Sequence, residues 1–308
     1  MKLADITKDN RGETAMDKKK ELDIIPCTEG DDEFVAEKIG EITGSMIVYE
    51  DAVDDELAVF KVTDSGGSII AGCNLIISRW RTAELDILWV DEKYRGQGIG
   101  SALLREAERA AEARGCRFMT LGTFDFQAKP MYEKFGFEVC GTIGDCPTKG
   151  HTHYDMIKRL DAPSAEDAPA APCDYEIVPG SEEDAEFIDD SLVEYNWSVV
   201  PRVCDFEYFG KKIEDGGNTA AGAFAGVNFW NIAFLDMIWV DEPCRRQGIG
   251  SGLLADLERE AKEKGAFIVM ADARDWNADF FRKCGYTVYC TLEDCPEGYR
   301  KYKMQKRL

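Results

Sequence analysis

The chain has 308 residues, of which 44% are hydrophobic and 31% charged, and its formal net charge at pH 7 is −22. This composition is typical of a soluble globular protein, and at roughly 100–200 residues per domain the length predicts two domains. The negative charge argues against nucleic acid or an anionic membrane as the main partner, and we find no apolar run of the roughly 18 residues that cross a bilayer. Such a charge serves solubility or attracts cationic substrates such as amines.

The eleven cysteines are scattered without a C-x-x-C pair, and the chain has two histidines. Zinc sites need clustered ligands at short spacing, so we predict no metal. Reduced, mostly buried thiols indicate a cytoplasmic protein. Cys140 and Cys146 recur in equivalent places as Cys290 and Cys295, where a disulfide or redox role is the alternative to buried thiols.

The chain contains a long internal repeat. After a polar segment, residues 1–21, which predicts a mobile tail, the sequence WVDEKYRGQGIGSALL at residues 89–104 returns as WVDEPCRRQGIGSGLL at residues 239–254. A period this long exceeds the roughly 20–50 residues of solenoid repeats and indicates two whole domains in tandem. We place them at residues 22–160 and 174–308, joined by an Ala- and Pro-rich linker at residues 161–173.

The first half shows a mixture of strand and helix patterns. Apolar and β-branched runs predict strands, and apolar positions at helical spacing predict two helices that each end at a glycine. The predicted strands are residues 68–78, 82–90, 116–124, 137–143 and 153–160, and the predicted helices are residues 100–115 and 127–136. Strand, helix and strand around the glycine-rich stretch form a right-handed βαβ unit.

The glycine-rich stretch RGQGIGS, residues 95–101, lies between a strand and a helix. A helix start offers unpaired N–H groups and a positive dipole end, and Gly98 and Gly100 let a ligand approach the backbone closely. This chemistry suits a phosphate or pyrophosphate, to which Ser101 can add a hydroxyl. A P-loop needs a lysine after its last glycine and a dinucleotide fingerprint needs G-x-G-x-x-G, so neither fits; a tight turn alone is the plain alternative.

The context is more specific. The motif R-x-x-G-x-G follows a strand that ends in LWV and precedes an amphipathic helix, and MYEKFGF comes after the next strand. This combination resembles the GNAT N-acetyltransferase superfamily, and the resemblance covers both halves. It implies two tandem α+β folds, each with a mostly antiparallel mixed sheet flanked by helices and a central βαβ unit that binds acetyl-CoA. By this resemblance the pantetheine arm contacts Leu88, Trp89, Val90, Ile238, Trp239 and Val240. The pyrophosphate contacts Arg95, Gly96, Gln97, Gly98, Ile99, Gly100 and Ser101, and in the second half Arg245, Arg246, Gln247, Gly248, Ile249, Gly250 and Ser251.

The resemblance also implies catalytic residues. Tyr132 stands where many family members carry the tyrosine that protonates the departing thiolate, and Phe281 replaces it in the second half. Glu84 stands eleven residues before Arg95, the spacing at which histone-acetylating relatives carry a glutamate general base. Strand alternation predicts that Glu84 and Asp86 share the face of Leu88 and Val90, although an exposed strand carboxylate is the alternative.

These assignments predict an N-acetyltransferase that moves an acetyl group from acetyl-CoA to a primary amine of a small molecule or peptide. We expect the first half to be catalytic and the second to be degenerate or regulatory. In this superfamily the acceptor site is built by the first helices, here residues 32–52 and 185–201. A non-catalytic acyl-CoA-binding regulator or partner-binding module is the rival, and the two halves can pair as an intramolecular pseudo-dimer.

Overall fold

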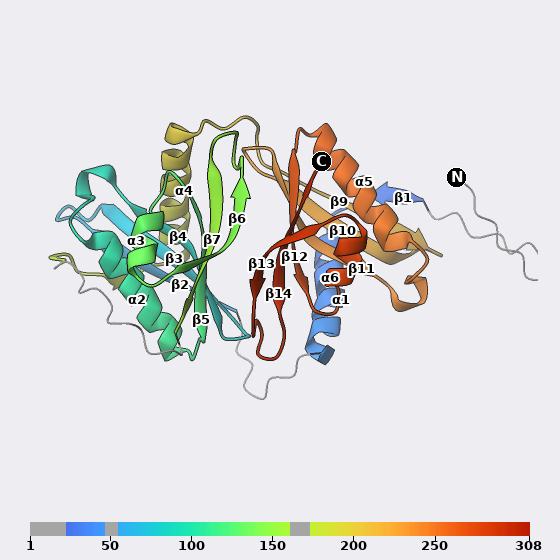
Figure 1. Ribbon diagram of the computed structural model, residues 1–308, viewed down its shortest axis with the longest axis horizontal. Helices are drawn as coiled ribbons and strands as arrows, with labels where there is room; N and C mark the ends of the chain where they lie inside the picture. Colours follow the sequence, from blue (N-terminus) through green and yellow to red (C-terminus); the bar gives the residue numbers. More distant parts are fainter. Residues whose placement is uncertain (1–22, 47–54, 161–172) are drawn as a thin grey trace, which may run out of the picture.

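The computed structural model describes residues 23–46, 55–160 and 173–308, arranged as two sheets with flanking helices (Figure 1). The predicted tail, residues 1–21, and all but the last residue of the predicted linker lie outside these ranges. Within them, none of the helices combines the length and apolar character needed to cross a membrane.

The first sheet has seven strands in the order β6-β7-β5-β4-β3-β2-β8. Its β4 and β5 are parallel and all its other pairs are antiparallel. The strands are β2 (Glu56–Thr63), β3 (Ile69–Ser78), β4 (Thr82–Val90), β5 (Phe118–Phe124), β6 (Glu138–Gly144), β7 (Thr152–Arg159) and β8 (Val178–Pro179). The helices α2 (Ile99–Ala113) and α3 (Lys129–Lys134) and the 3-10 turn η1 (Glu92–Tyr94) accompany this sheet.

The second sheet repeats this plan in the order β1-β9-β10-β11-β12-β14-β13, with β11 and β12 parallel. Its strands are β1 (Ile24–Pro26), β9 (Glu207–Asp215), β10 (Asn218–Val227), β11 (Ile232–Val240), β12 (Ile268–Arg274), β13 (Thr287–Leu292) and β14 (Lys301–Arg307). Its helices include α5 (Ile249–Glu263), α6 (Ala278–Lys283) and the 3-10 turn η2 (Glu242–Cys244). The predicted fold class, two mixed and mostly antiparallel sheets with central βαβ units, is confirmed.

The core of each sheet is sealed by the helix that follows the glycine-rich turn. In α2 the apolar side chains recur at helical spacing, and Leu103, Leu104 and Ala107 are fully buried. The helix ends where Gly115 adopts a left-handed backbone with φ 69°. This packing fixes the start of α2 against the end of β4, where the functional site lies.

The two halves of the sequence exchange their first strand and helix. Strand β1, from the first half, pairs with β9 of the second sheet, and β8, from the second half, pairs with β2 of the first sheet. Helix α1 (Asp31–Met46) packs on β10 and β11, whereas α4 (Glu182–Val199) packs on β2, β3 and β4. Figure 1 shows α1, in blue, among the orange and red elements of the second sheet. Each sheet is therefore completed by the other half of the chain.

Matching contacts hold the exchanged helices in place. Lys61 Nζ lies 2.7 Å from the carboxylate of Asp184 on α4. A Cβ atom added to Gly72 would lie 2.2 Å from Ile188 Cδ1, so α4 rests directly on the backbone of β3. Equivalent contacts join α1 to the second sheet, between Lys212 and Asp31 and between Gly222 and Val35.

The halves also contact each other through β6 and β13, where equivalent residues meet (Figure 1). Cys140 Sγ lies 2.8 Å from Cys290 Sγ, and all eleven cysteines are free thiols. Lys303 Nζ lies 2.5 Å from Asp155 Oδ1, and these residues occupy corresponding positions in β14 and β7. At this contact each residue faces the corresponding residue of the other half. In an exact duplicate the two facing residues would be identical, whereas here they are Lys303 and Asp155, whose charges are complementary.

Candidate active site

Strands β4 and β5 separate before β4 ends. Their parallel register runs from Thr82 opposite Phe118 to Leu85 opposite Leu121, whereas β4 continues to Val90. On the other side β4 stays paired with β3, but the register shifts so that Leu75 faces Leu85 and Asn74 faces Ile87. Asp86 is therefore the extra residue of a β-bulge, which bends and twists the strand. The last part of β4 thus presents its backbone to the gap beside β5.

The glycine-rich turn closes one end of this gap. Gly98 is the N-cap residue of α2, has a left-handed φ of 81° and provides no side-chain cap. The first N–H groups of α2 are therefore available to an anionic ligand. A Cβ atom at Gly100 would lie 3.5 Å from Val90 Cγ2 and 3.7 Å from Met131 Sδ, in a space that the glycine leaves free. Backbone donors and close approach are what a pyrophosphate and a pantetheine arm require, so these residues fit coenzyme A.

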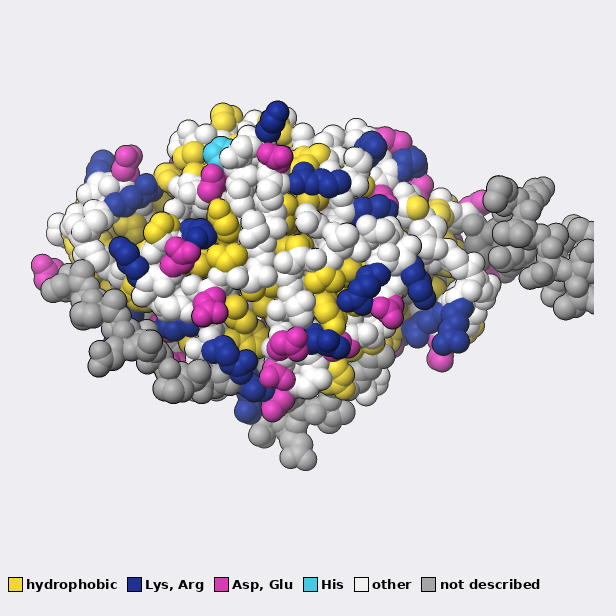
Figure 2. All heavy atoms as spheres, viewed as in Figure 1, with side chains coloured by type: hydrophobic (Ala, Val, Ile, Leu, Met, Phe, Trp, Pro, Cys, Tyr) yellow, Lys and Arg dark blue, Asp and Glu magenta, His cyan; other side chains and the backbone are white. Residues whose placement is uncertain are grey.

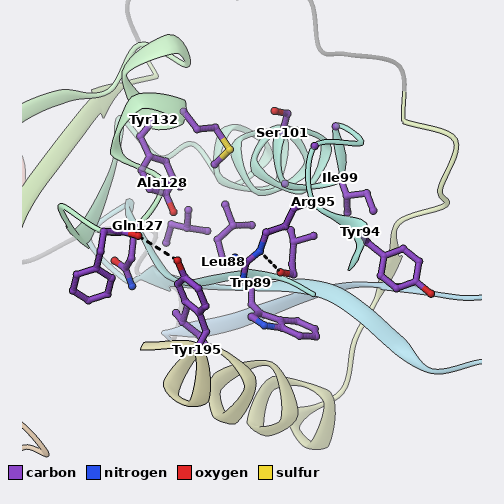
Figure 3. Close-up of a pocket in the computed structure, with 18 of the residues that line it drawn as sticks. Leu88, Trp89, Tyr94, Arg95, Ile99, Ser101, Gln127, Ala128, Tyr132 and Tyr195 are labelled. Atoms are coloured by element: carbon purple, nitrogen blue, oxygen red, sulfur yellow. Dashed lines mark hydrogen bonds between the residues drawn. The ribbon is translucent and has the colours of Figure 1, made fainter. Parts of the chain in front are cut away.

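A cavity of about 540 Å³ occupies the gap, within the usual size range of ligand pockets (Figure 3). Every residue predicted to bind the coenzyme in the first half lines it except Gln97, whose Oε1 accepts a hydrogen bond of 3.2 Å from Tyr175. The cavity is lined by Leu85, Asp86, Leu88, Trp89, Val90, Tyr94, Arg95, Gly96, Gly98, Ile99, Gly100, Ser101, Gly122, Phe126, Gln127, Ala128, Met131, Tyr132, Leu192 and Tyr195.

Tyr132 lines this cavity from α3, a short helix with Pro130 in its first turn. The side chain is largely buried, and Figure 3 shows it reaching from α3 into the space above β4. Burial, and to a smaller extent the thiol of Cys73, raises the pKa of Tyr132 above its ordinary value. The hydroxyl therefore remains protonated at neutral pH, as a proton donor must.

Glu84 does not share a face with Leu88 and Val90, and the predicted alternation is wrong for this strand. Ala83 and Leu85 pack in the same core as Leu88 and Val90, because the bulge at Asp86 shifts the alternation by one residue. Glu84 therefore points to the opposite face of the sheet. Desolvation lowers the pKa of Lys303, but the charges of Asp155, Asp272 and Glu84, in decreasing order, raise it above its ordinary value.

Asp86 is the carboxylate that lines the cavity. Its side chain keeps contact with solvent but lies in a concave part of the surface. Desolvation, followed by the charges of Glu84 and Asp189, raises the pKa of Asp86 to about 6. A carboxyl group with such a pKa can exchange a proton near neutral pH.

Arg95 lines the cavity and remains exposed to solvent. Its Nε donates a hydrogen bond of 3.0 Å to the carbonyl of Val90, and its guanidinium lies 4.3 Å from the ring centroid of Tyr195. Arg245 repeats the first contact in the second half, where Nε donates to the carbonyl of Val240 over 2.8 Å. This arginine therefore ties the glycine-rich turn to the strand end in both halves.

Sequence reasoning missed the contribution of α4. It assigned residues 32–52 to the acceptor side of the first half, but α1 packs on the second sheet and α4 supplies Leu192 and Tyr195 to the first cavity. The motifs in which the two helices begin, PCTEGDDEF and PGSEEDAEF, are similar and share five of nine residues. No local signal in the sequence distinguishes the two pairings.

The second sheet has the same framework with different side chains. The register of β11 and β12 ends at Leu235 opposite Ala271, and the N-cap Gly248 has a φ of 84°. Phe281, at the place of Tyr132, is buried, and the carboxylate of Asp236 accepts a hydrogen bond of 2.7 Å from Tyr208. The second-half residues predicted to bind the coenzyme lie at the end of β11, in the turn and at the start of α5: Ile238, Trp239, Val240, Arg245, Arg246, Gln247, Gly248, Ile249, Gly250 and Ser251. Arg246 adopts a left-handed φ of 62°, which its counterpart Gly96 reaches without a Cβ atom.

A family model described as the acetyltransferase (GNAT) family matches residues 28–137 and 173–286. The chain therefore belongs to this family of acyltransferases, and it carries two tandem copies of the family's domain. This agrees with the split parallel strands and the uncapped glycine-rich turn in each sheet.

Similarity to individual proteins is more limited. Blasticidin-S acetyltransferase of Streptomyces morookaense is 40% identical over 83 residues, which are 27% of this chain and 60% of that protein. Thialysine N-epsilon-acetyltransferase of Mus musculus is 34% identical over 71 residues, 21% of this chain and 42% of that protein. A crystal structure of an acetyltransferase from Bacillus cereus ATCC 14579 is 33% identical and covers 43% of this chain and 94% of its own, with a TM-score of 0.41. The chain thus spans less than two thirds of both curated relatives.

Proposed function

We propose that this protein is an acetyl-CoA-dependent N-acetyltransferase that transfers the acetyl group directly to a primary amine of a small molecule or peptide. The observation that carries the proposal is the position of Tyr132. Its buried hydroxyl group lines the same cavity as the uncapped start of α2 and the separated end of β4. A proton donor thus stands beside the place where these two elements suit coenzyme A.

Bound acetyl-CoA supplies an activated thioester. As the amine nitrogen forms its bond to the carbonyl carbon, the carbon–sulfur bond breaks and the electron pair leaves with sulfur. In our proposal Tyr132 gives its hydroxyl proton to that sulfur. Asp86, with a pKa of about 6, receives the proton that the nitrogen loses. The charge of Glu84 contributes, after desolvation, to the raised pKa of Asp86.

The second half differs at the residue that matters most for this chemistry. Phe281 replaces Tyr132 and has no proton to donate. Asp236 is engaged by the hydroxyl group of Tyr208, whereas Asp86 lines an open cavity. These differences support a binding or regulatory role, without turnover, for the second half.

The test is release of free thiol from acetyl-CoA by the full chain with a panel of amines and peptides. Tyr132→Phe should lower kcat by about 10²–10⁴-fold, the usual contribution of a proton-transfer group, and should leave the calorimetric Kd for CoA nearly unchanged. Phe281→Leu is the matched control and should retain turnover. Full activity of Tyr132→Phe, or loss of activity in Phe281→Leu with the fold intact, would reverse the assignment of the two halves.

A further inference from the structure

A second cavity, of about 580 Å³, lies between the two halves of the chain and shares no lining residue with the first. The loop between β6 and β7 lines one side of it, and the segment after α4 lines another. The turn between β10 and β11, Phe267 just before β12 and Arg307 at the end of β14 complete the wall from the second sheet. Figure 1 shows the segment after α4 passing from the first sheet toward the second. The cavity therefore depends on the packing of both halves.

Part of the wall of this cavity is apolar and aromatic. Trp230, Phe267 and Val200 contribute to it. Trp230 Nε1 donates a hydrogen bond of 2.9 Å to the carbonyl of Val200, which fixes the indole ring and satisfies its N–H group. Trp230 also packs edge-on against Phe124, with 5.4 Å between the ring centroids, and Phe267 packs against the same hydrophobic cluster. This part of the wall suits a flat apolar group.

Two basic side chains, Lys149 and Arg307, line the cavity beside this apolar surface. The guanidinium of Arg307 lies 5.3 Å from the ring centroid of Phe267, and its Nη2 donates a hydrogen bond to the carbonyl of Gly144. Gly144 directly precedes the loop that carries Lys149, so both cations lie against the same loop. Within the parts of the chain that the structure describes, neither cation forms an ion pair.

The lining contains one acidic residue, Asp145, whose carboxylate accepts a hydrogen bond of 2.9 Å from the backbone of Gly150. The cavity thus has two cations and one carboxylate in a chain whose net charge is −22. Figure 2 shows acidic and basic side chains intermixed on the face it displays, so the preference for an anion rests on Lys149 and Arg307 and not on a broad positive surface. A carboxylate would accept charge-assisted hydrogen bonds from both.

The corresponding place in the duplicated sequence is filled by ion pairs. Arg117, which stands where the second half has Phe267, lies 3.6 Å from Asp294 and 3.3 Å from Glu297. The loop at residues 294–298 reads DCPEG, whereas its counterpart at residues 145–150 reads DCPTKG, without the glutamate and with an added lysine. The two places therefore differ at both ends of the contact. One has an arginine between two carboxylates, and the other has an aromatic ring and an unpaired lysine.

We propose that the cavity between the halves is a binding site for a small organic anion, an aromatic ring that carries a carboxylate. The ring lies against Trp230 and Phe267, and the carboxylate accepts hydrogen bonds from Arg307 and Lys149. The site is separate from the first cavity, so this inference is independent of the proposed function and its chemistry.

The test is calorimetric titration of the full chain with 1-naphthylacetate, compared with the uncharged 1-naphthylacetamide and with 1-naphthyl phosphate. We expect saturable binding of the acetate, and binding of the amide weaker by about tenfold or more, the factor that a hydrogen bond to a charged group contributes. Arg307→Gln should raise the Kd for the acetate by about tenfold for the same reason. The acetate should also change the tryptophan fluorescence, and this change should be lost in Trp230→Phe.

Thr148→Glu is the most direct variant, because it gives the exposed loop of the first half the glutamate that the second half has at Glu297. The new carboxylate would pair with the neighbouring cations and should weaken acetate binding by about tenfold or more. Glu297→Thr makes the reverse change in the corresponding loop. It is the matched control and should leave the Kd for the acetate unchanged.

Several results would overturn the inference. The full chain could show no saturable binding of 1-naphthylacetate, or it could bind the amide equally well, which would assign the affinity to the apolar wall alone. Unchanged affinity in Thr148→Glu, or an equal loss in Glu297→Thr, would place the probe elsewhere. Tighter binding of 1-naphthyl phosphate would overturn the choice of a carboxylate. None of these results bears on acetyl transfer, which the release of thiol tests separately.

Discussion

The ion pair between Lys303 and Asp155 gives the sharpest prediction about stability, because it joins the two halves at a buried position. Asp155 is 2% exposed, and Lys303 Nζ lies 2.5 Å from its Oδ1. His153 could also pair with Asp155, because its Nδ1 lies 3.6 Å from Asp155 Oδ2. Desolvation lowers the pKa of His153, however, so its ring is neutral at pH 7. Lys303→Met therefore leaves a buried carboxylate without a charged partner.

Removing one member of a buried pair costs about 3–5 kcal/mol, and we expect the unfolding free energy of the full chain to fall by that amount. Urea denaturation followed by tryptophan fluorescence measures it. The double variant Lys303→Met with Asp155→Leu should recover most of the loss, because no unpaired charge remains. Arg109→Met is the control: Arg109 pairs with Glu106 at an exposed surface, so its loss should cost less than about 1 kcal/mol.

Two results would refute this reasoning. A loss below about 1 kcal/mol in Lys303→Met would mean that the pair behaves like an exposed one. A double variant as unstable as the single one would mean that packing of the lysine stem, and not the unpaired charge, carries the effect.

Three further predictions concern the site and the contact between the halves. With the pKa of Asp86 at about 6, kcat/KM should fall as the pH drops below 6, because the carboxylate becomes protonated. Asp86→Asn should lower the rate and remove this acidic limb from the pH profile. An acidic limb that persists in the variant would assign it to another group. Gly98→Val forces a side chain into a left-handed backbone at a cost of about 1–2 kcal/mol and should weaken CoA binding, measured by calorimetry, roughly tenfold. Gly248→Val should leave turnover mostly intact. The reverse pattern would place the chemistry in the second half. Diamide, which accepts the two thiol hydrogens, should join Cys140 to Cys290, detected by peptide mass mapping, and continued alkylation of both thiols would contradict the observed contact.

Much of the framework could be predicted because its signals are local. The repeat at residues 89–104 and 239–254 indicated two copies of one fold, and a strand followed by glycines and an amphipathic helix indicated the βαβ unit of each. Gly98 and Gly100 could be named from the glycine-rich turn and Tyr132 from the family resemblance of MYEKFGF, and the structure places all three around one cavity. Backbone geometry at such a turn depends on a few neighbouring residues, which the sequence displays directly.

The orientation of Glu84 could not be predicted in this way. Strict alternation put Glu84 beside Leu88 and Val90, but the bulge at Asp86 shifts the register. A bulge depends on how β3 and β4 pair with each other, and the sequence of neither strand alone indicates it. The choice between two neighbouring carboxylates therefore depended on tertiary structure.

By itself, the sequence determined the fold of each half, the glycine-rich turn and the difference between Tyr132 and Phe281, since these follow from local pattern and from residue identity. Only the tertiary structure decided that α1 and α4 change places between the sheets. The two helices begin in similar motifs, and each makes the same kind of lysine and glycine contact with the sheet on which it packs. Which sheet each helix joins is therefore fixed by the packing of the whole chain, and that packing brings Tyr195 to the first cavity.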